Sequence, residues 1–414
     1  MRALAVSTHF PGDFSKQTYG VFKRLDVFMS AISTLCSALD ILFYTPPDFE
    51  ISVEKVHALQ DIYSARWGIE INLHLCTRNS ITDAPSVFSH YVLPIFDIRR
   101  QRSYSFASAS AQVRSFEARL DRKHDFIFVH RLYGMMPVLL TKKTVAPVFL
   151  DLDDIEHKWF YNSISQPPHW AAKKLLYLQV PALYLVERAA VRRARRTFVC
   201  SVADRDYLSE RWSLPSVVQV QNAMPVPLLD PLTTAKTLLF LGSFAYGPNV
   251  VAASELIEKI WPDILAQVPD AKLFITGDHP SNIPAYNSSP PSVVFTGFVS
   301  DIDELYRRVR GVVCPIRSGG GTRLKIIEGA LRGKAIVSTT IGAEGLGLQD
   351  GVHLLVRDGR ADIVAACVSL LNDDNEARRL GSNARAKGME LYDKEKIAQD
   401  ISGQIMSALH DRNH

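Results

Sequence analysis

Short apolar runs rich in β-branched and aromatic residues alternate along the chain with longer segments in which apolar residues recur at helical spacing. In the first half these runs are RALAVST, DILFYT, EINLHL, DFIFVHR, APVFLDLD, RTFVCS and VVQVQN. The segment VFKRLDVFMSAISTLCSALD, between the first two runs, has the period of an amphipathic helix. Strands that alternate with helices predict a mostly parallel, doubly wound sheet.

The same pattern starts again after PVPLLDPLTTAK, a proline-rich stretch that is typical of a linker. The apolar runs of the second half are TLLFLGS, AKLFITG, SVVFTG, GVVCP, KAIVSTT and VHLLVRD. We therefore expect two α/β domains of similar size, over residues 1–225 and 237–392, with a linker at 226–236. The amphipathic segment 393–414 follows the last strand–helix unit and could cross back to the first domain.

The composition is that of a soluble globular protein, since 22% of the 414 residues are charged and 47% are hydrophobic. The five cysteines are scattered and odd in number, so we expect neither a disulfide framework nor a zinc site, and a cytoplasmic location fits best. The N-terminus runs directly into an apolar strand pattern, and no segment reaches about 18 uncharged apolar residues. These features predict neither a secretory signal nor a membrane span.

The positive charge is concentrated in the first half of the chain. Residues 1–225 hold 27 Lys and Arg against 21 Asp and Glu, whereas residues 226–414 hold 20 against 22. We expect the first half to face a large anionic partner, such as membrane headgroups or a phosphorylated acceptor. The helical segment 171–196 ends in a cluster of arginines, namely Arg192, Arg193, Arg195 and Arg196. The cluster is interpreted either as a contact with anionic lipid or as an ordinary solvated helix end, and without interleaved aromatic residues it does not predict nucleic-acid binding.

The densest motif is CPIRSGGGTRLKIIEGALRGK, residues 314–334. Three glycines follow a predicted strand and lead into a helix that opens near Thr322, so backbone N–H groups there can approach an anion closely. Arg323 and Lys325 add two cations to the first turn, which is unfavourable unless an anion binds there. Glu328 lies about one turn deeper, where its carboxylate could accept hydrogen bonds from ribose hydroxyls. The motif predicts a phosphate cradle; the alternative is a glycine-rich loop with solvated charges.

Two common nucleotide motifs do not fit this chain. The motif is not a Walker A loop, because Ala335 follows Gly333 and Lys334 where a hydroxyl is needed for magnesium. No clean GxGxxG follows a first strand with an acidic residue at the Rossmann spacing, which disfavours a nicotinamide dehydrogenase.

In the first half, polar residues at the ends of two predicted strands are candidates for function. His130 ends the strand DFIFVH, and a strand's carboxyl end points to the ligand side of a parallel sheet; the alternative is a structural histidine. The sequence DLDD, residues 151–154, has three interpretations. It could bind a divalent metal through Asp151 and Asp153, cap a helix through Asp153 and Glu156, or bind an acceptor hydroxyl through Asp153 or Asp154.

The motifs of the second half together resemble the donor site of the family 4 retaining glycosyltransferases, which have the GT-B fold. The resemblance covers LGSFAYGPNV, LFITGD, VVFTGFVSDIDELY, VVCPIRSGGGTRLKIIEGALRGKAIVST, and GAEGL followed by HLLVRD. The first domain matches more loosely, through HFPGDFSKQTYG, VHRLYG and VVQVQNAMP. The resemblance implies an α/β protein of two doubly wound Rossmann-like domains that face each other across a cleft.

The resemblance also implies roles for individual residues. Glu328 would hold the donor ribose, Arg323 and Lys325 would balance the diphosphate, and His130 would lie near the donor sugar. The remaining implied donor-binding residues are Gly20, Gly242, Ser243, Phe298, Val299, Gly320, Gly321 and Thr322. The sequence departs from the family at Gly320, since the family commonly has a second glutamate eight positions before the one matched by Glu328, and this departure leaves the donor sugar open.

The implied reaction is the transfer of a sugar from a nucleoside diphosphate sugar to a hydroxyl of a saccharide or lipid-linked acceptor. It would retain the anomeric configuration, need no metal or other cofactor, and serve polysaccharide or glycoconjugate biosynthesis in the cytoplasm or at the inner face of the membrane. Two alternatives stay open: a nucleotide-sugar epimerase of the same architecture, and a non-catalytic nucleotide-sugar-binding protein, which the glycine at position 320 suggests.

Overall fold

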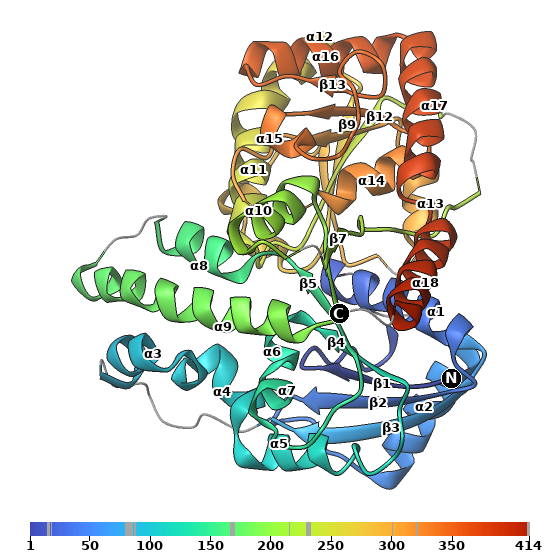
Figure 1. Ribbon diagram of the computed structural model, residues 1–414. Coiled ribbons are helices and arrows are strands. Elements are labelled where there is room, and N and C mark those ends of the chain that lie inside the picture. The colour runs from blue at the N-terminus through green and yellow to red at the C-terminus, as the bar shows by residue number, and fades with distance from the viewer. Residues whose placement is uncertain are drawn as a thin grey trace. The chain divides into compact units, whose positions relative to one another are not determined.

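Two parallel β-sheets, each covered by helices, form the centres of two units of the chain (Figure 1). The computed structural model describes residues 1–414 except 15, 16, 18, 79–85, 87, 166–169, 215, 229–232, 300, 320, 321 and 412–414. The first unit comprises residues 1–221 together with 397–414, and the second comprises residues 222–396. Both sheets confirm the predicted α/β class.

The sheet of the first unit has seven strands in the order β3-β2-β1-β4-β5-β6-β7, with parallel pairing throughout. The strands are β1 (Arg2–Ser7), β2 (Ala38–Thr45), β3 (Glu70–Thr77), β4 (Phe126–His130), β5 (Val148–Asp153), β6 (Arg196–Val199) and β7 (Val217–Gln219). The chain runs outward from β1 to β3 and then returns to β4 beside β1. The carboxyl ends of β1 and β4 therefore flank the switch point at which such sheets place their ligands.

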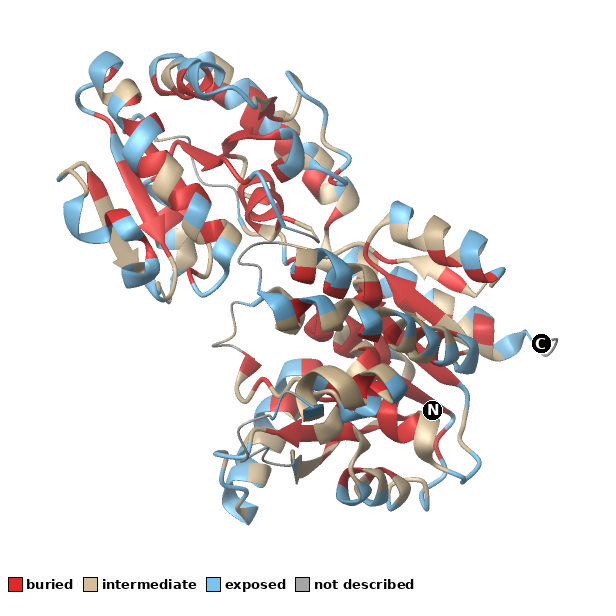
Figure 2. Ribbon diagram, turned by 90° about the vertical axis from the view of Figure 1, so that its left-hand side faces the viewer, coloured by how far each residue is buried: buried red, intermediate tan, exposed pale blue. Residues whose placement is uncertain are grey.

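The helices of the first unit cover both faces of this sheet, and Figure 2 shows the buried residues along the strands and on the inner sides of the helices. They are α1 (Gly20–Leu35), α2 (Val53–Trp67), η2 (Phe88–Val92), α3 (Leu93–Phe96), η3 (Ile98–Arg100), α4 (Arg102–Ser108), α5 (Ser110–Glu117), α6 (Arg131–Gly134), α7 (Met136–Leu140), α8 (Glu156–Ser165), η4 (Ala171–Gln179), α9 (Val180–Arg193), α10 (Val202–Trp212) and α18 (Lys394–His410). The central strands are buried on both faces, as continuous apolar runs predict. Phe28 of α1, for example, stacks on Phe128 of β4 at 5.1 Å.

The C-terminal helix α18 packs on α1 in the first unit (Figure 1). The Ser402 hydroxyl donates to the carbonyl of Ala31 at 2.9 Å. Arg195 donates to the carbonyl of Ala408 at 2.9 Å, and Arg196 donates to that of Gln404 at 2.8 Å. These two arginines thus differ from the predicted exposed cluster, because α9 already ends at Arg193 and they bind the last turns of α18 instead.

The sheet of the second unit has six parallel strands in the order β10-β9-β8-β11-β12-β13. They are β8 (Thr237–Leu241), β9 (Lys272–Thr276), β10 (Val293–Gly297), β11 (Gly311–Cys314), β12 (Ala335–Ser338) and β13 (Leu355–Val356). The helices are α11 (Gly247–Glu255), η5 (Leu256–Ile260), α12 (Trp261–Gln267), η6 (Pro280–Asn282), η7 (Pro284–Ser288), α13 (Ile302–Arg307), α14 (Leu324–Leu331), α15 (Thr340–Ala343), α16 (Arg360–Asn372) and α17 (Asp374–Leu391). The switch point of this sheet lies between β8 and β11.

No helix in the described ranges is both long enough and apolar enough to cross a bilayer. Part of the expected linker, residues 229–232, lies outside the described residues, and the chain enters β8 at Thr237.

Candidate active site

Two glycines bring the loops after β8 and β9 into direct backbone contact in the second unit. A Cβ on Gly277 would lie 1.9 Å from the carbonyl oxygen of Gly242, and Gly277 has a positive φ of 144°. A side chain on Gly242 would also collide with the amine of Lys325, whose Nζ would be 2.9 Å from its Cβ. Only glycines permit this packing, and it places the lysine amine against the backbone at the switch point.

Lys325 is buried without a carboxylate partner among the described residues. Its Nζ donates to Oδ1 of Asn249 at 2.8 Å and lies 4.3 Å from the centre of the Phe240 ring. Burial lowers the pKa of this amine to about 8. Asn249 is held in turn by the bond from its Nδ2 to the carbonyl of Ser243, at 2.8 Å. A buried cation in these surroundings gains most from an anionic ligand.

Arg323 lies immediately before α14, next to the glycine loop that the sequence singles out. The helix begins at Leu324, two residues later than predicted, so Arg323 is its N-cap and Lys325 its second residue. The guanidinium of Arg323 is buried and donates to the carbonyl of Gly319 at 2.9 Å. Thr322 is half-buried. The predicted donor-binding residues Gly320 and Gly321 lie outside the described residues.

Glu328 is buried on α14, one turn after Lys325. Its Oε1 lies 3.4 Å from a guanidinium nitrogen of Arg332, which also binds Asp303 at 2.7 Å. Burial, followed by the charge of Glu328, raises the pKa of Tyr306 well above its usual value. The carboxylate is therefore fixed in position by α14 and by its ion pair.

The other predicted donor residues follow strands of the same sheet. Ser243 follows β8, and Phe298 and Val299 follow β10, two strands farther along the sheet. The side chain of Phe298 is 56% exposed, which leaves an aromatic face accessible at the carboxyl edge of the sheet. All of these positions share one edge of the sheet with Arg323 and Lys325.

His130 occupies the switch point of the first unit and is completely buried. Its Nδ1 lies 2.9 Å from the hydroxyl of Ser7 at the end of β1. That hydroxyl accepts from the amide of His9 at 3.0 Å and donates to the carbonyl of His9 at 3.2 Å. Nδ1 of His130 and this hydroxyl can each donate to the other, depending on the tautomer of the ring, and Nε2 of His130 has no partner among the described residues. Burial, and then the neighbouring His9, lower the pKa of His130 well below its usual value, so the ring is neutral.

The sequence DLDD forms an ion network at the end of β5. Arg24 of α1 binds Asp151 at 2.7 Å and lies 3.3 Å from Asp153. Asp153 also pairs with Arg131, and both of these residues have positive φ, 62° and 63° respectively. Such backbone strain in non-glycine residues is characteristic of functional sites. Burial raises the pKa of Asp154, beside the network, to about 6.

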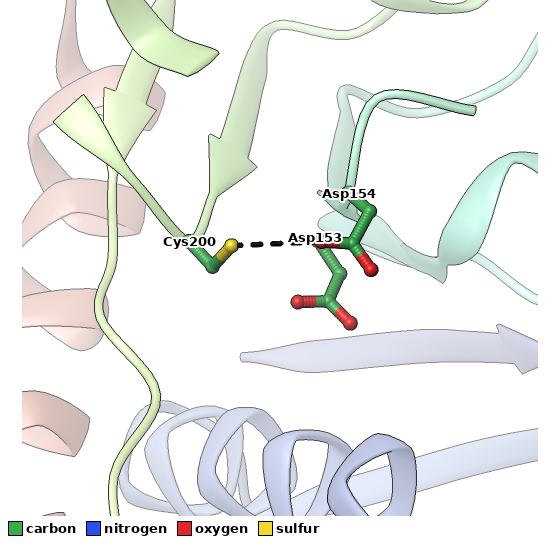
Figure 3. Close-up of side chains that lie close together, drawn as sticks. All are labelled: Asp153, Asp154 and Cys200. Carbon is green, nitrogen blue, oxygen red and sulfur yellow. Dashed lines mark hydrogen bonds between the residues drawn. The ribbon is translucent and has the colours of Figure 1, made fainter. Parts of the chain in front are cut away.

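The same aspartates lie next to a thiol, and Figure 3 shows Asp153, Asp154 and Cys200 side by side. One ligand atom from each lies within 4.8 Å of the others, and the Cys200 Sγ is 3.8 Å from Asp154 Oδ1. Burial, and then the two carboxylates, raise the pKa of the thiol far above its usual value. The chemistry of this donor set therefore fits a metal poorly, because the thiol is protonated and Asp153 is neutralised by Arg131.

The interpretation of Asp153 and Glu156 as a capping box is wrong. Asp153 belongs to β5 and its carboxylate is engaged by arginines, whereas α8 begins at Glu156. The amide of Glu156 is bound instead by the buried Glu187 of α9, at 2.7 Å. A capping partner that is distant in sequence leaves no local signal.

The structure places one more predicted residue and adds three that the sequence did not indicate. Gly20, the predicted phosphate-loop glycine, is the first residue of α1. Sequence analysis missed Arg24, Arg131 and Asn249 as members of the sites. A signal existed for Arg24, a cation in the apolar stretch VFKRLDVF, and for Asn249 within GPNV, but neither identifies its partner.

Comparisons with known proteins agree with this arrangement. Residues 235–373 match the model of the family described as Glycosyl transferases group 1. A relative described as an uncharacterized 44.6 kDa protein in the cps region of Klebsiella pneumoniae is 19% identical over 294 residues, which are 69% of this chain and 75% of that protein.

Solved structures are similar over nearly the whole chain. Sucrose-phosphate synthase from Thermosynechococcus elongatus is 15% identical, with a TM-score of 0.68 and complete coverage of both chains. HepE from Anabaena, in complex with UDP and glucose, is 14% identical, with a TM-score of 0.61 and coverage of 98% of this chain and 99% of that one. The second unit thus carries the sequence features of the group 1 glycosyl transferases, and the chain has the GT-B fold of two Rossmann-like domains.

Proposed function

We propose that this protein transfers a sugar from a nucleoside diphosphate sugar to an acceptor hydroxyl, with retention of the anomeric configuration. The observation that carries the proposal is the buried, carboxylate-free amine of Lys325, held against the glycine backbone at the switch point of the second unit. A diphosphate supplies the anion that this amine lacks. The family match over the same residues supports the assignment.

Catalysis in this proposal is mainly electrostatic. As the bond between the sugar carbon and the phosphate oxygen breaks, negative charge develops on the leaving diphosphate. In this proposal, Lys325, Arg323 and backbone amides of the glycine loop before α14 stabilise that charge. The acceptor oxygen forms the new bond to the same carbon, and its proton passes to the leaving phosphate. The two cations take the role that a divalent metal has in other glycosyltransferases.

The remaining donor contacts are assigned by position. Glu328 accepts hydrogen bonds from the ribose hydroxyls. Gly242 and Ser243 contact the phosphates, and Phe298 and Val299 contact the base. Gly20, at the start of α1, contributes an N–H at a helix N-terminus. In the first unit, Nε2 of His130, which has no partner among the described residues, is assigned a hydrogen bond with a hydroxyl of the donor sugar. HepE, which has the same fold, was solved with UDP and with glucose, in keeping with a donor of this class.

The acceptor side of the proposal lies in the first unit. Asp154, beside the strained pair of Arg131 and Asp153, offers a partly accessible carboxylate that can bind an acceptor hydroxyl. We assign a saccharide or lipid-linked saccharide as the acceptor class, and polysaccharide biosynthesis as the process. The relative described as lying in a cps region supports this process.

The proposal is tested by incubating the protein with UDP-, GDP- and ADP-sugars and measuring free nucleoside diphosphate. We expect release with one of them, and loss of release in Lys325→Ala but not in the control Lys259→Ala, an exposed lysine of the same unit. Conversion of the sugar without release of the nucleotide would identify an epimerase. Binding without either reaction would identify a nucleotide-sugar-binding protein.

A further inference from the structure

Exposed apolar and aromatic side chains gather in the first unit on α8, η4 and α9 together with η2 and α3. Figure 1 shows α8, α9 and α3 as neighbouring helices. These elements contact one another in series. Seven of the nineteen large hydrophobic side chains that are exposed in the described part of the chain lie on these elements or, for Trp170, at the N-cap of η4: Phe88, Phe96, Trp159, Tyr161, Trp170, Leu178 and Leu185. We call these seven residues the aromatic surface.

Two side-chain contacts link members of this surface to neighbouring elements. The indole nitrogen of Trp170, the N-cap of η4, donates to the hydroxyl of Tyr91 in η2 at 3.3 Å. The ring centroids of Tyr161 in α8 and Tyr177 in η4 are 5.7 Å apart, so the two rings are in contact. Exposed large apolar side chains that gather on neighbouring elements can mark an interaction site.

On the described parts of these elements, the exposed charges that form no ion pair are positive. Both acidic residues of α8 and α9, Glu156 and Glu187, are buried. Arg192 and Arg193 are exposed at the end of α9, and neither forms an ion pair with another described residue. Asp97, beside α3, is neutralised by Arg99 at 2.7 Å.

Helix α9 combines the apolar and the basic character on one face. Pro181, Leu185, Ala189 and Arg192 follow one another at helical spacing, and all four are exposed. An exposed helical face that is apolar along its length and basic at its end is complementary to a partner with an apolar interior and an anionic surface. Such a partner is an anionic lipid bilayer.

We propose that the aromatic surface docks this protein on an anionic bilayer, in the headgroup layer and without crossing it. Tryptophan and tyrosine concentrate in that layer because one end of each ring is apolar and the other is polar. The exposed leucines would insert below the headgroups, and Arg192 and Arg193 would bind lipid phosphates. The proposal replaces the cluster of four arginines that the sequence suggests with two of them and an apolar face.

The aromatic rings alone would also suit a saccharide, but two observations favour lipid. Leu178 and Leu185 are 53% and 60% exposed, and an aliphatic side chain gains little from a hydrated sugar. The acidic groups of α8 and α9, which could accept sugar hydroxyls, are turned inward. Docking is independent of the proposed transferase activity, so the two can fail separately.

The experiment is co-sedimentation of the full chain with vesicles of phosphatidylcholine alone or with 30% phosphatidylglycerol. We expect binding to the anionic vesicles, weakened by salt. The double variant Arg192→Gln/Arg193→Gln should lower the affinity about 10- to 30-fold, because each arginine near an anionic surface contributes about 1 kcal/mol. The double variant Leu178→Glu/Leu185→Glu should abolish binding. The matched control is Val53→Glu, on an exposed apolar residue of α2, and it should bind like the wild type.

Other outcomes would overturn the proposal. Docking by this surface is excluded if the wild-type protein binds neither kind of vesicle. It is also excluded if the Val53→Glu variant binds as weakly as the leucine variant. A dimer in size-exclusion chromatography that the leucine variant dissociates, without vesicle binding, assigns the surface to a second copy of the chain. Loss of oligosaccharide binding in the same variant assigns it to an acceptor saccharide. Nucleotide affinity measured by calorimetry reports the donor site separately in every variant.

Discussion

A single buried lysine determines much of what the second unit can do. Lys325 contributes no ion pair to the described fold, and its amine is held by an amide oxygen and an aromatic ring. A cation in such surroundings destabilises the folded state, so its retention is best explained by a ligand. Lys325 is therefore expected to serve ligand binding and not the stability of the fold.

Replacing Lys325 with methionine should therefore raise stability while removing activity. We expect turnover to fall by about a hundredfold or more, as the loss of a charge-stabilising donor does in a closed site. The melting temperature at pH 7 should stay the same or rise, because an uncompensated buried charge is replaced by an apolar chain of similar length. Steady-state kinetics and calorimetric unfolding measure the two effects; a strongly destabilised variant would assign the lysine to the fold instead.

The depressed pKa of Lys325 predicts how donor binding responds to pH. The free protein loses the ammonium proton near pH 8, and a bound diphosphate favours the charged form. Affinity for the free nucleoside diphosphate should thus be constant below pH 8 and fall by up to about tenfold per pH unit above it. Stability of the unliganded protein should change in the opposite direction and rise between about pH 8 and 10.5, because the unfolded chain then binds more protons. Calorimetric titrations from pH 6.5 to 9.5 check the first effect, and the methionine variant should show no such fall.

At the scale of single residues, the sequence predicts residue types better than partners. Arg323, Lys325 and Glu328 stand out because charges are unusual in an apolar helix that follows glycines. That Asn249 holds the lysine is invisible, since 76 residues separate the two in the chain. The same holds for Arg24 and Asp151, which are 127 residues apart.

At the scale of elements, the loops after β8 and β9 depend on close backbone contact. Replacing Gly277 with alanine places a Cβ 1.9 Å from the carbonyl oxygen of Gly242, at a positive φ, so the loops must separate. We expect nucleotide affinity to fall more than tenfold. Gly247→Ala, at the start of α11, is the control, because a Cβ there meets no atom within 4 Å. Equal affinities in the two variants would show that the contact between the loops does not position the donor site.

Strands were easier to predict than helix boundaries. Parallel strands buried on both faces are continuous apolar runs, and the seven and six strands coincide with the runs in the sequence. The stretch 171–196, in contrast, is divided into η4, α9 and the first residue of β6. The break between α9 and β6 arises where the chain turns back to pair with β5, a tertiary constraint that helical periodicity does not contain.

At the scale of the whole molecule, side-chain cations supply the positive charge that a metal could otherwise supply in both units. In the first unit, Arg24 and Arg131 neutralise Asp151 and Asp153. In the second, Arg323 and Lys325 supply positive charge at the proposed diphosphate site. The sequence motif DLDD allowed a metal interpretation because Arg24 lies far away in the chain.

This distribution of charge predicts a transferase that does not depend on divalent ions. Chelation with EDTA should leave the release of nucleoside diphosphate within about twofold of the untreated rate, because no step needs a Lewis acid at the phosphates. The informative variant is Arg131→Met, which leaves Asp153 next to Asp154 with only one of its two arginines. If the carboxylates bind an acceptor hydroxyl, this variant should raise the apparent acceptor constant and leave donor affinity unchanged, with or without EDTA. Activity that collapses on chelation and returns with manganese would instead make these aspartates metal ligands, and the cations of the second unit would then be insufficient to balance the diphosphate.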